Sequence, residues 1–291
     1  MARVWFITGT SRGFGRVWAQ AALERGDSVA ATARDTRTLE DLAAAHGERL
    51  LALQLDVTDK AGIEESVRSA HEHFGRLDVV VNNAGYGQFG AIEELTEQEA
   101  RLQIETNLFG PLWVTKAVVP LLREQRSGHI IQVSSIGGRL ATAGLSAYQA
   151  AKWAVGGFSE VLAREVGPLG IKVTVLEPGG MRTDWAGSSM RVPPVSEPYQ
   201  PTVGAMARLH HDLGSANALG DPAKVARVVL EVASMAEPPL RLILGSEAYA
   251  YAMAAARARA EADAAWHDLT VSTDRDDATA ADRDPLGAAA G

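Results

Sequence analysis

Cysteine is absent from this 291-residue chain, and its histidines form no metal-binding pattern. Without cysteine the protein has no disulfide, no thiolate nucleophile and no thiolate metal ligand. His71 and His73 point in different directions on a predicted helix, and the pair of His210 and His211 lacks an obvious third ligand. We therefore predict that the protein holds no metal ion.

Long apolar runs and a surplus of positive charge are missing too. The chain has no run of about 18 uncharged apolar residues, as a membrane-spanning helix requires. Its first residues enter a strand-like segment without a basic and apolar leader. A net charge of −8 argues against nucleic acid or an anionic membrane as the main partner. We expect a cytoplasmic protein that acts on a small molecule.

Short apolar runs alternate with helical patterns along most of the chain. Strands are predicted at residues 3–8, 28–33, 50–55, 78–81, 129–134, 171–176 and 240–244. The helical segments between them predict an α/β fold: a doubly wound, Rossmann-like, mainly parallel seven-stranded sheet with helices on both faces. No shift in composition divides this part, so we predict a single domain over residues 1–250. A helical extension over 251–270 and a disordered tail over 271–291 should follow.

The first strand leads into a glycine-rich turn and then a helix that we predict from residue 16. Backbone N–H groups converge at such a helix N-terminus, and glycines let a phosphate come close, so this order predicts a dinucleotide pyrophosphate site. The alternative is a turn without a ligand. The candidate cofactor contacts are Gly9, Ser11, Arg12, Gly13, Phe14 and Gly15.

The second strand ends without the acid that commonly holds the ribose 2′-hydroxyl of NAD. Ala33 and Arg34 stand there instead, and Arg12 lies in the glycine turn. Because a guanidinium suits a 2′-phosphate better than a bare ribose, we predict NADP(H) rather than NAD(H). The alternative is that Arg34 is a solvated loop charge and that Asp35 contacts the ribose.

Two further strands end in small or polar residues. Asp56 and Val57 follow the third strand, and the segment Asn82-Asn83-Ala84-Gly85 ends the fourth. Ligands of open parallel sheets lie outside the carboxyl ends of the strands. Both turns should therefore face the cofactor, although the adjacent asparagines could simply form a turn.

A long predicted helix begins at a capping box of Thr96 and Glu99. It is interrupted at residues 107–111, where proline alone costs on the order of 3 kcal/mol in a helix interior. A kink at Asn107 would free a backbone carbonyl to bind a water. That water would connect Lys152, a candidate catalytic residue described next, to solvent. The alternative is two helices joined by a turn.

Ser135, Tyr148 and Lys152 carry the predicted chemistry. The spacing of four places Tyr148 and Lys152 on the same helical face. A free tyrosine loses its proton only near pH 10, and we expect the lysine cation to lower that pKa. Ser135 would hold the substrate oxygen. Such a tyrosine and lysine pair also occurs by accident on surface helices, although lysine is scarce here, with five against 23 arginines.

Taken together, the chain resembles a short-chain dehydrogenase/reductase of the single-domain kind over about residues 1–250. The matching motifs are TGTSRGFG at 8–15, DV at 56–57, NNAG at 82–85, Asn107, Ser135, YQAAK at 148–152 and PGGMRT at 178–183. Three residues separate Gly9 from Gly13, whereas the extended branch of sugar epimerases and dehydratases typically has two. The shorter branch fits better.

The resemblance implies a role for each matching residue. Tyr148 would be the catalytic acid/base, and Lys152 would lower its pKa and hold the nicotinamide ribose. Ser135 would position the substrate oxygen and Asn107 would anchor a relay water. Side chains of neighbouring strand residues point to opposite faces, so only one of Ser134 and Ser135 should face the site. The family's spacing favours Ser135, and Ser134 is the lesser candidate. The implied cofactor-lining residues are Asp56, Val57, Asn83, Ala84, Gly85, Pro178, Gly179 and Thr183.

Residues 184–220 show no clear strand pattern and are rich in apolar side chains. A structureless segment of this length in a compact domain is typical of a lid, here over a hydrophobic substrate. The alternative is that these residues merely pack the loop down. The predicted pocket residues are Tyr86, Phe89, Leu140, Trp185 and Met190.

We therefore predict an NADP(H)-dependent oxidoreductase that interconverts an apolar ketone or aldehyde and its alcohol. We expect it to form a homodimer or homotetramer. Two alternatives remain at this point. One is a non-catalytic nucleotide sensor or scaffold on the same fold, and the other is a sugar epimerase or dehydratase.

Overall fold

The computed structural model describes residues 2–183, 189–212 and 218–284. Within them, a seven-stranded parallel sheet has the strand order β3-β2-β1-β4-β6-β7-β9. The predicted doubly wound sheet is confirmed. The strands are β1 Val4–Ile7, β2 Ser28–Ala33, β3 Leu50–Gln54, β4 Val79–Asn82, β6 Gly128–Val133, β7 Ile171–Pro178 and β9 Arg241–Leu244.

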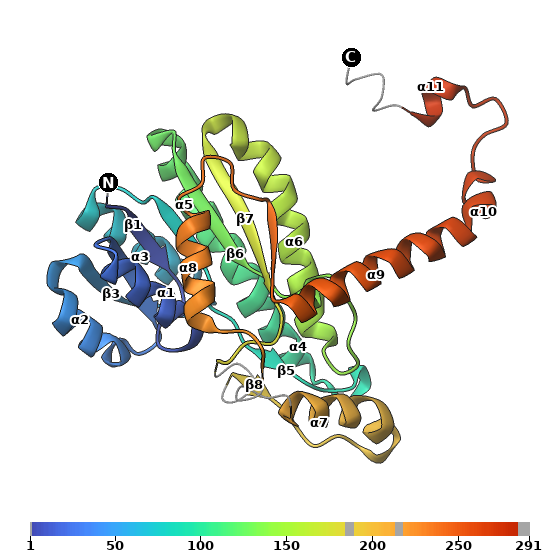
Figure 1. Ribbon diagram of the computed structural model, residues 1–291, viewed down its shortest axis with the longest axis horizontal. Coiled ribbons are helices and arrows are strands. Elements are labelled where there is room, and N and C mark those ends of the chain that lie inside the picture. Colours follow the sequence, from blue (N-terminus) through green and yellow to red (C-terminus); the bar gives the residue numbers. More distant parts are fainter. Residues whose placement is uncertain (1, 184–188, 213–217, 285–291) are drawn as a thin grey trace.

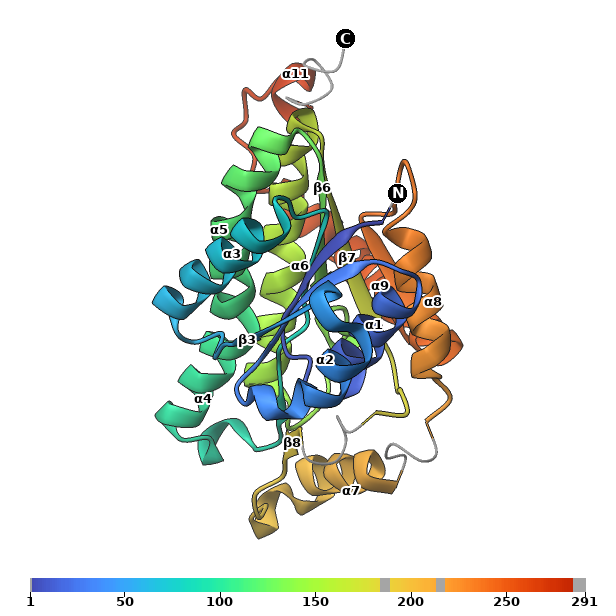
Figure 2. The same cartoon turned by 90° about the vertical axis from the view of Figure 1, so that its left-hand side faces the viewer.

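Helices cover both faces of this sheet (Figure 1), and Figure 2 shows α1 and α8 on the opposite side from α3 and α5. Side chains of β1 alternate between the two layers, with Trp5 and Ile7 in one core and Val4 and Phe6 in the other. Strands buried on both faces explain the continuous apolar runs of the sequence. The helices are α1 Gly13–Glu24, α2 Glu40–His46, α3 Lys60–Phe74, α5 Gly110–Gln125, α6 Ser146–Val166 and α8 Pro222–Val232.

The strand order reverses between β1 and β4, which is where ligands bind in sheets of this kind. The turns that follow these two strands are tied together. Thr8 Oγ1 accepts hydrogen bonds from the backbone N–H groups of Asn83 and Ala84, each at 3.0 Å. Asn83 Nδ2 donates to the carbonyl oxygen of Gly9 at 3.0 Å. These hydrogen bonds hold the turns after β1 and β4 together at the end of the sheet where the strands finish, called the carboxyl edge here.

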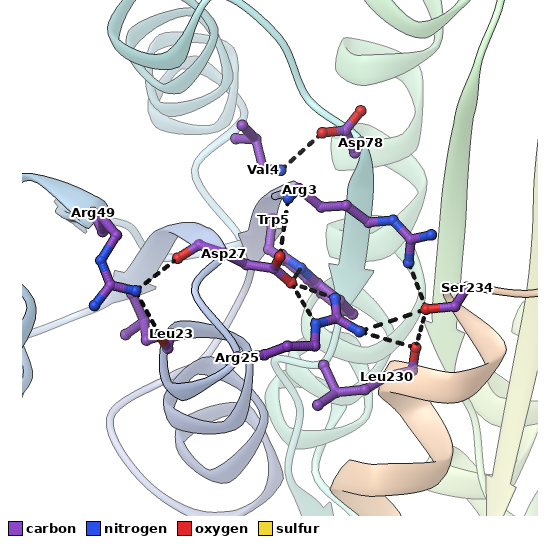
Figure 3. Close-up of polar contacts among 10 residues, drawn as sticks. All are labelled: Arg3, Val4, Trp5, Leu23, Arg25, Asp27, Arg49, Asp78, Leu230 and Ser234. Atoms are coloured by element: carbon purple, nitrogen blue, oxygen red, sulfur yellow. Dashed lines mark hydrogen bonds and ion pairs between the residues drawn. The ribbon is translucent and has the colours of Figure 1, made fainter. Parts of the chain in front are cut away.

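The opposite edge of the sheet, where the strands begin, is called the amino edge here. Asp27 is a buried carboxylate at this edge (Figure 3). Its Oδ1 accepts from the backbone N–H of Arg3 at 3.0 Å, and its Oδ2 accepts from Trp5 Nε1 at 2.8 Å. Arg25 pairs with the same carboxylate and reaches the carbonyl oxygen of Leu230 in α8. Asp27 therefore joins β1, the end of α1 and α8.

The prediction that residues 184–220 lack regular structure is wrong for the part that is described. β8, Met190–Arg191, pairs in parallel with β5, Gly87–Gln88. A 3₁₀ turn at Glu197–Tyr199, a π turn at Gln200–Gly204 and helix α7 at Ala205–Asp212 follow. The sequence concealed them because β8 depends on a distant partner and α7 spans only eight residues, too few for a clear helical period.

Helix α9, Ser246–Ala265, begins at the sheet and projects away from it, followed by α10, His267–Val271 (Figure 1). The helical extension was predicted, and the tail that we expected to be disordered contains the short helix α11, Ala280–Arg283. Large apolar side chains are exposed here, among them Tyr249 of α9, Leu269 of α10 and Trp266 between the two helices. Across the described ranges, no helix combines the length and apolarity needed to cross a membrane.

Candidate active site

A cavity of about 1000 Å³ lies at the carboxyl edge of the sheet and runs from the glycine turn to α7. It brings together most of the residues predicted from the sequence, although they come from the ends of several strands and from helical segments. The predicted residues that line it are Gly9, Ser11, Arg12, Gly13, Phe14, Arg34, Asp56, Val57, Asn83, Ala84, Gly85, Tyr86, Phe89, Asn107, Ser135, Leu140, Tyr148, Lys152, Pro178, Gly179 and Thr183.

The glycine turn leaves room for a phosphate. Gly9 and Gly13 have φ angles of +71° and +59°, which side chains rarely adopt. Helix α1 begins at Gly13, earlier than the predicted residue 16, and its first turn holds no acidic residue. Its first N–H groups and its positive dipole end therefore suit an anion. Gly15 packs beneath the turn, since a Cβ there would lie 2.3 Å from the carbonyl oxygen of Gly9.

Arg34 and Asp35 lie side by side at the end of β2 but differ in their contacts. Arg34 is exposed and, like Arg12, lines the cavity. Asp35 accepts hydrogen bonds from the backbone and the guanidinium of Arg37, and these bonds hold its pKa below the usual value. Asp35 is not among the described residues that line the cavity. A dinucleotide whose adenosine ribose lay at the end of β2 would therefore meet a cationic rather than an anionic side chain there.

Asn107 is fully buried in a π turn, Glu105–Phe109, between α4, Glu97–Ile104, and α5. The chain stays helical from α4 through this π segment into α5, so the alternative of two separate helices joined by a non-helical turn is wrong. Asn107 Nδ2 donates to the carbonyl oxygens of Tyr86 and Gln103 at 2.9 and 3.1 Å, and its Oδ1 accepts from the Tyr86 N–H at 3.2 Å. Single π turns occur frequently at functional sites.

Ser135, Tyr148 and Lys152 converge on the middle of the cavity. Tyr148 and Lys152 are 4% and 5% exposed, and Ser135 forms a hydrogen bond with the Tyr148 side chain. Lys152 Nζ lies 5.7 Å from the centre of the tyrosine ring and donates to the carbonyl oxygen of Val133 at 2.8 Å. Ser134 instead donates to the carbonyl oxygen of Lys152 at 3.0 Å. Ser135 is therefore the serine that faces the tyrosine.

Burial shifts the pKa values of Tyr148 and Lys152. Burial raises the pKa of Tyr148 to about 12, and the hydrogen bond from Ser135 only partly opposes the rise. Burial lowers the pKa of Lys152 to about 8. The expected lowering of the tyrosine pKa by the lysine is therefore not seen in this arrangement: burial dominates, and only the hydrogen bond with Ser135 opposes it. A tyrosine that keeps its proton at neutral pH is suited to donate one.

The far end of the cavity is mainly apolar. Tyr86, Phe89 and Leu140 line it as predicted. Met190 does not, because it is buried in a cluster with Phe89, Leu145, Tyr148 and Ala207. Its strand pairs with β5, and Met190 contacts the cavity only through residues of that cluster that line it, so a direct substrate contact for Met190 stays a prediction. Trp185 lies outside the described residues.

Sequence reasoning missed other residues of this end. Met206, Leu209 and His210 from α7 line the cavity, and the His210 ring lies 5.4 Å from that of Phe89. The apolar character of the segment pointed to Met206 and Leu209, whereas no local pattern marked His210 as a pocket residue. Glu247 and Tyr251 line the wall nearest α9, and no motif marked them.

Comparison with known proteins agrees with this geometry. The short chain dehydrogenase family matches residues 3–191, and the chain belongs to this family. It is 54% identical over 275 residues to oxidoreductase BOA17 of Botryotinia fuckeliana, a match that covers 94% of this chain and 100% of that protein.

Solved structures show the same fold. A short-chain dehydrogenase from Streptomyces avermitilis superimposes with a TM-score of 0.89 at 40% identity, covering 94% of this chain and 100% of that one. An alcohol dehydrogenase from Thermococcus sibiricus, complexed with 5-hydroxy-NADP, gives 0.70 at 28% identity over 84% and 96% of the two chains. The protein is thus an oxidoreductase with a fold that binds NAD or NADP.

Proposed function

We propose that this protein uses NADP(H) to interconvert an apolar ketone or aldehyde and its alcohol. The observation that carries the proposal is the single cavity that joins the glycine turn, the trio of Ser135, Tyr148 and Lys152, and an apolar end beside α7. A dinucleotide along the first part would reach the trio, and a carbonyl compound would approach from the second. A binding protein without catalysis would need no buried tyrosine and lysine at the junction.

The side chains have complementary roles in reduction. Tyr148 donates its proton to the carbonyl oxygen, and Ser135 holds that oxygen by a hydrogen bond. Lys152, with a pKa of about 8, carries a proton at neutral pH and can return it to the tyrosine side of the site. Bound NADPH would supply the hydride. The buried Asn107 fixes the wall beside Lys152 and would hold a relay water.

The preference for NADP(H) rests on the end of β2. Short-chain dehydrogenases use either nucleotide, so the choice depends on local side chains. Arg34 and Arg12 can pair with a 2′-phosphate, and the adjacent acid, Asp35, is held by Arg37. The nucleotide named with the Thermococcus sibiricus structure, 5-hydroxy-NADP, agrees with this choice.

The proposal is tested by following NADPH absorbance with a panel of ketones and aldehydes graded by size and polarity. We expect turnover to rise with the apolar character of the substrate until the cavity is filled. A parallel panel of nucleotide sugars tests the epimerase or dehydratase alternative, in which the cofactor is recycled and not consumed. Tight NADPH binding without turnover of any carbonyl compound would instead indicate a sensor.

A further inference from the structure

Glu177 is a buried carboxylate that the proposed reaction does not use. It lies near the end of β7 and is fully shielded from solvent. It is not among the described residues that line the cavity, although the next two residues, Pro178 and Gly179, are. A carboxylate without solvent is costly unless hydrogen-bonded partners compensate its charge. The residues that pair with Glu177 therefore identify the segments that this carboxylate connects.

Two arginines from different elements compensate the charge of Glu177. Arg139 Nε donates to Oε2 at 2.6 Å, and Arg241 Nη1 donates to Oε1 at 2.6 Å. Each carboxylate oxygen thus has its own guanidinium. Arg241 also donates through Nε to Glu160 of α6 at 2.6 Å. The four side chains form one chain of charges across three elements and a loop.

This chain of charges connects the segments that carry the reacting groups. Arg139 ends the turn that begins at Ser135. Glu177 precedes the loop at Pro178 and Gly179 that walls the cavity. Glu160 lies on the helix that carries Tyr148 and Lys152. One carboxylate and its arginines thus span the serine turn, the cavity wall and the tyrosine helix.

Helix α6 is shaped to admit the Arg241 side chain. A Cβ at Gly156 would lie 2.5 Å from Arg241 Nη2 and 3.0 Å from its Cζ. Glycine at this position, one turn beyond Lys152, therefore lets the guanidinium rest against the helix backbone. The fit between Gly156 and Arg241 is independent of the carboxylate contacts and places the same guanidinium in the same position.

We propose that Glu177 is a positioning residue that fixes the serine turn relative to the cavity wall through Arg139 and Arg241. It acts through these arginines and touches neither the substrate nor the cofactor site. The inference rests on the proposed function, because the distance that it sets is the one between Ser135 and the nicotinamide side of the cavity.

Glu177→Gln tests this proposal, with Asp27→Asn as the matched control. Each variant removes one buried, arginine-paired carboxylate with little change of shape, but at opposite edges of the sheet. We expect Glu177→Gln to lower kcat for carbonyl reduction by about tenfold to a hundredfold, the effect of a small misplacement of reacting groups. Asp27→Asn should keep the wild-type kcat. Glu177→Asp, which keeps the charge but shortens its reach, should fall between.

Two binding probes give a readout that does not depend on turnover. NADPH would reach the wall at Pro178 and Gly179, whereas adenosine 2′,5′-bisphosphate would occupy only the end near Arg34. Calorimetric titration should show that Glu177→Gln weakens NADPH several-fold and leaves the bisphosphate unchanged. In Asp27→Asn the ratio of the two dissociation constants should stay at the wild-type value.

The outcomes decide between positioning and general stability. An unchanged kcat and an unchanged ratio of dissociation constants in Glu177→Gln would overturn the proposal. Equal losses in both variants that follow their melting temperatures would also overturn it. If the wild type reduces no carbonyl compound, the proposed function fails, and the ratio still decides the role of Glu177. Should Glu177→Gln not fold, Arg139→Gln replaces it as the test variant. It breaks the same ion pair at a side chain that is 29% exposed, and the same outcomes decide.

Discussion

Asp27 and Glu177 are two buried carboxylates at opposite edges of one sheet, 3% and 0% exposed. Both pair with arginines, and both join segments that are distant in the sequence. Asp27 joins β1, the C-terminal end of α1 and α8, and neither Asp27 nor these contacts are among the described residues that line the cavity (Figure 3). Glu177 joins the serine turn and the wall of the cavity. The same ionic chemistry thus supports the core at one edge and would tune a site at the other.

Glycines allow close contacts at both edges. At the carboxyl edge, glycines allow contacts that a side chain would block, as at Gly9, where a Cβ would lie 2.8 Å from Ala84 Cα. At the amino edge, Gly26 has open space around its Cβ position and serves only the turn before β2. At Gly170, before β7 at the same amino edge, a Cβ would lie 2.4 Å from the carbonyl oxygen of Arg126, so close approaches do not by themselves distinguish the two edges.

Tyr148→Phe should have the largest effect at the carboxyl edge. The ring would still pack against Leu145, but the proton donor is lost, so kcat should fall by about a thousandfold. NADPH binding and the melting temperature should stay near wild type. Steady-state kinetics with fluorescence titration checks this prediction, and substantial turnover by the variant would show that another group supplies the proton.

Gly85→Ala should come next. A Cβ there would lie 2.6 Å from Asn107 Oδ1 and 3.7 Å from Lys152 Nζ. Three hydrogen bonds hold the asparagine in place, so the lysine side of the site must shift, and we expect kcat to fall by about a hundredfold. Gly157→Ala, with nothing within 4 Å of its Cβ position, is the control and should be active. Equal activity of both variants would contradict the geometry.

Arg34→Ala should raise the KM for NADPH by about tenfold or more, because a charge-assisted hydrogen bond to the 2′-phosphate is lost. The KM for NADH should not change. Arg37→Ala removes an exposed arginine that pairs with Asp35 and should keep the wild-type preference unless the freed acid repels the phosphate. Initial rates with both cofactors measure the ratio, and a wild-type enzyme that prefers NADH would refute the assignment.

The pH profile should show a change of several-fold near the pKa of Lys152. Because that pKa is about 8, lowered by burial from 10.5, the cation is present below pH 8 and lost above it. Reduction should therefore slow as the pH rises through this value. In the same interval the unfolded chain binds the proton that the folded protein has released, so this group adds stability as the pH rises. A melting temperature that fell together with activity would contradict this explanation.

Asp27→Asn should have the smallest effect on activity and a clear effect on stability. Leaving the partners of a buried ion pair uncompensated costs about 3 kcal/mol, and this should appear as a lower midpoint in urea unfolding. We expect kcat and both cofactor constants to match the wild type. A loss of turnover under conditions where the variant is fully folded would remove the distinction between the edges.

The sequence predicted the features that depend on a few consecutive residues at a strand end. Gly9 to Gly15, the turn after β4 and the pair of Tyr148 and Lys152 each carry their own signal. The parallel sheet then brings those strand ends to one edge. An interruption of the α-helix near Asn107 could be anticipated from glycine and proline, but not its form as a π turn.

The features that the sequence concealed depend on distant partners. Met190 points into a core cluster because β8 pairs with β5, and no local pattern reports such a pairing. The pKa of Tyr148 rises through burial by elements from across the chain. Glu177 carries no motif, since only its contacts with Arg139 and Arg241 distinguish it.

The central claim is that the cavity at the carboxyl edge carries out hydride transfer between NADPH and a carbonyl carbon. It is tested most directly by supplying NADPH that carries deuterium on the reactive face of the nicotinamide and analysing the alcohol product by mass spectrometry. We predict one deuterium on the carbinol carbon with the wild type and almost no product with Tyr148→Phe. An unlabelled product, or NADPH that binds and is never consumed with any carbonyl compound, would contradict the account.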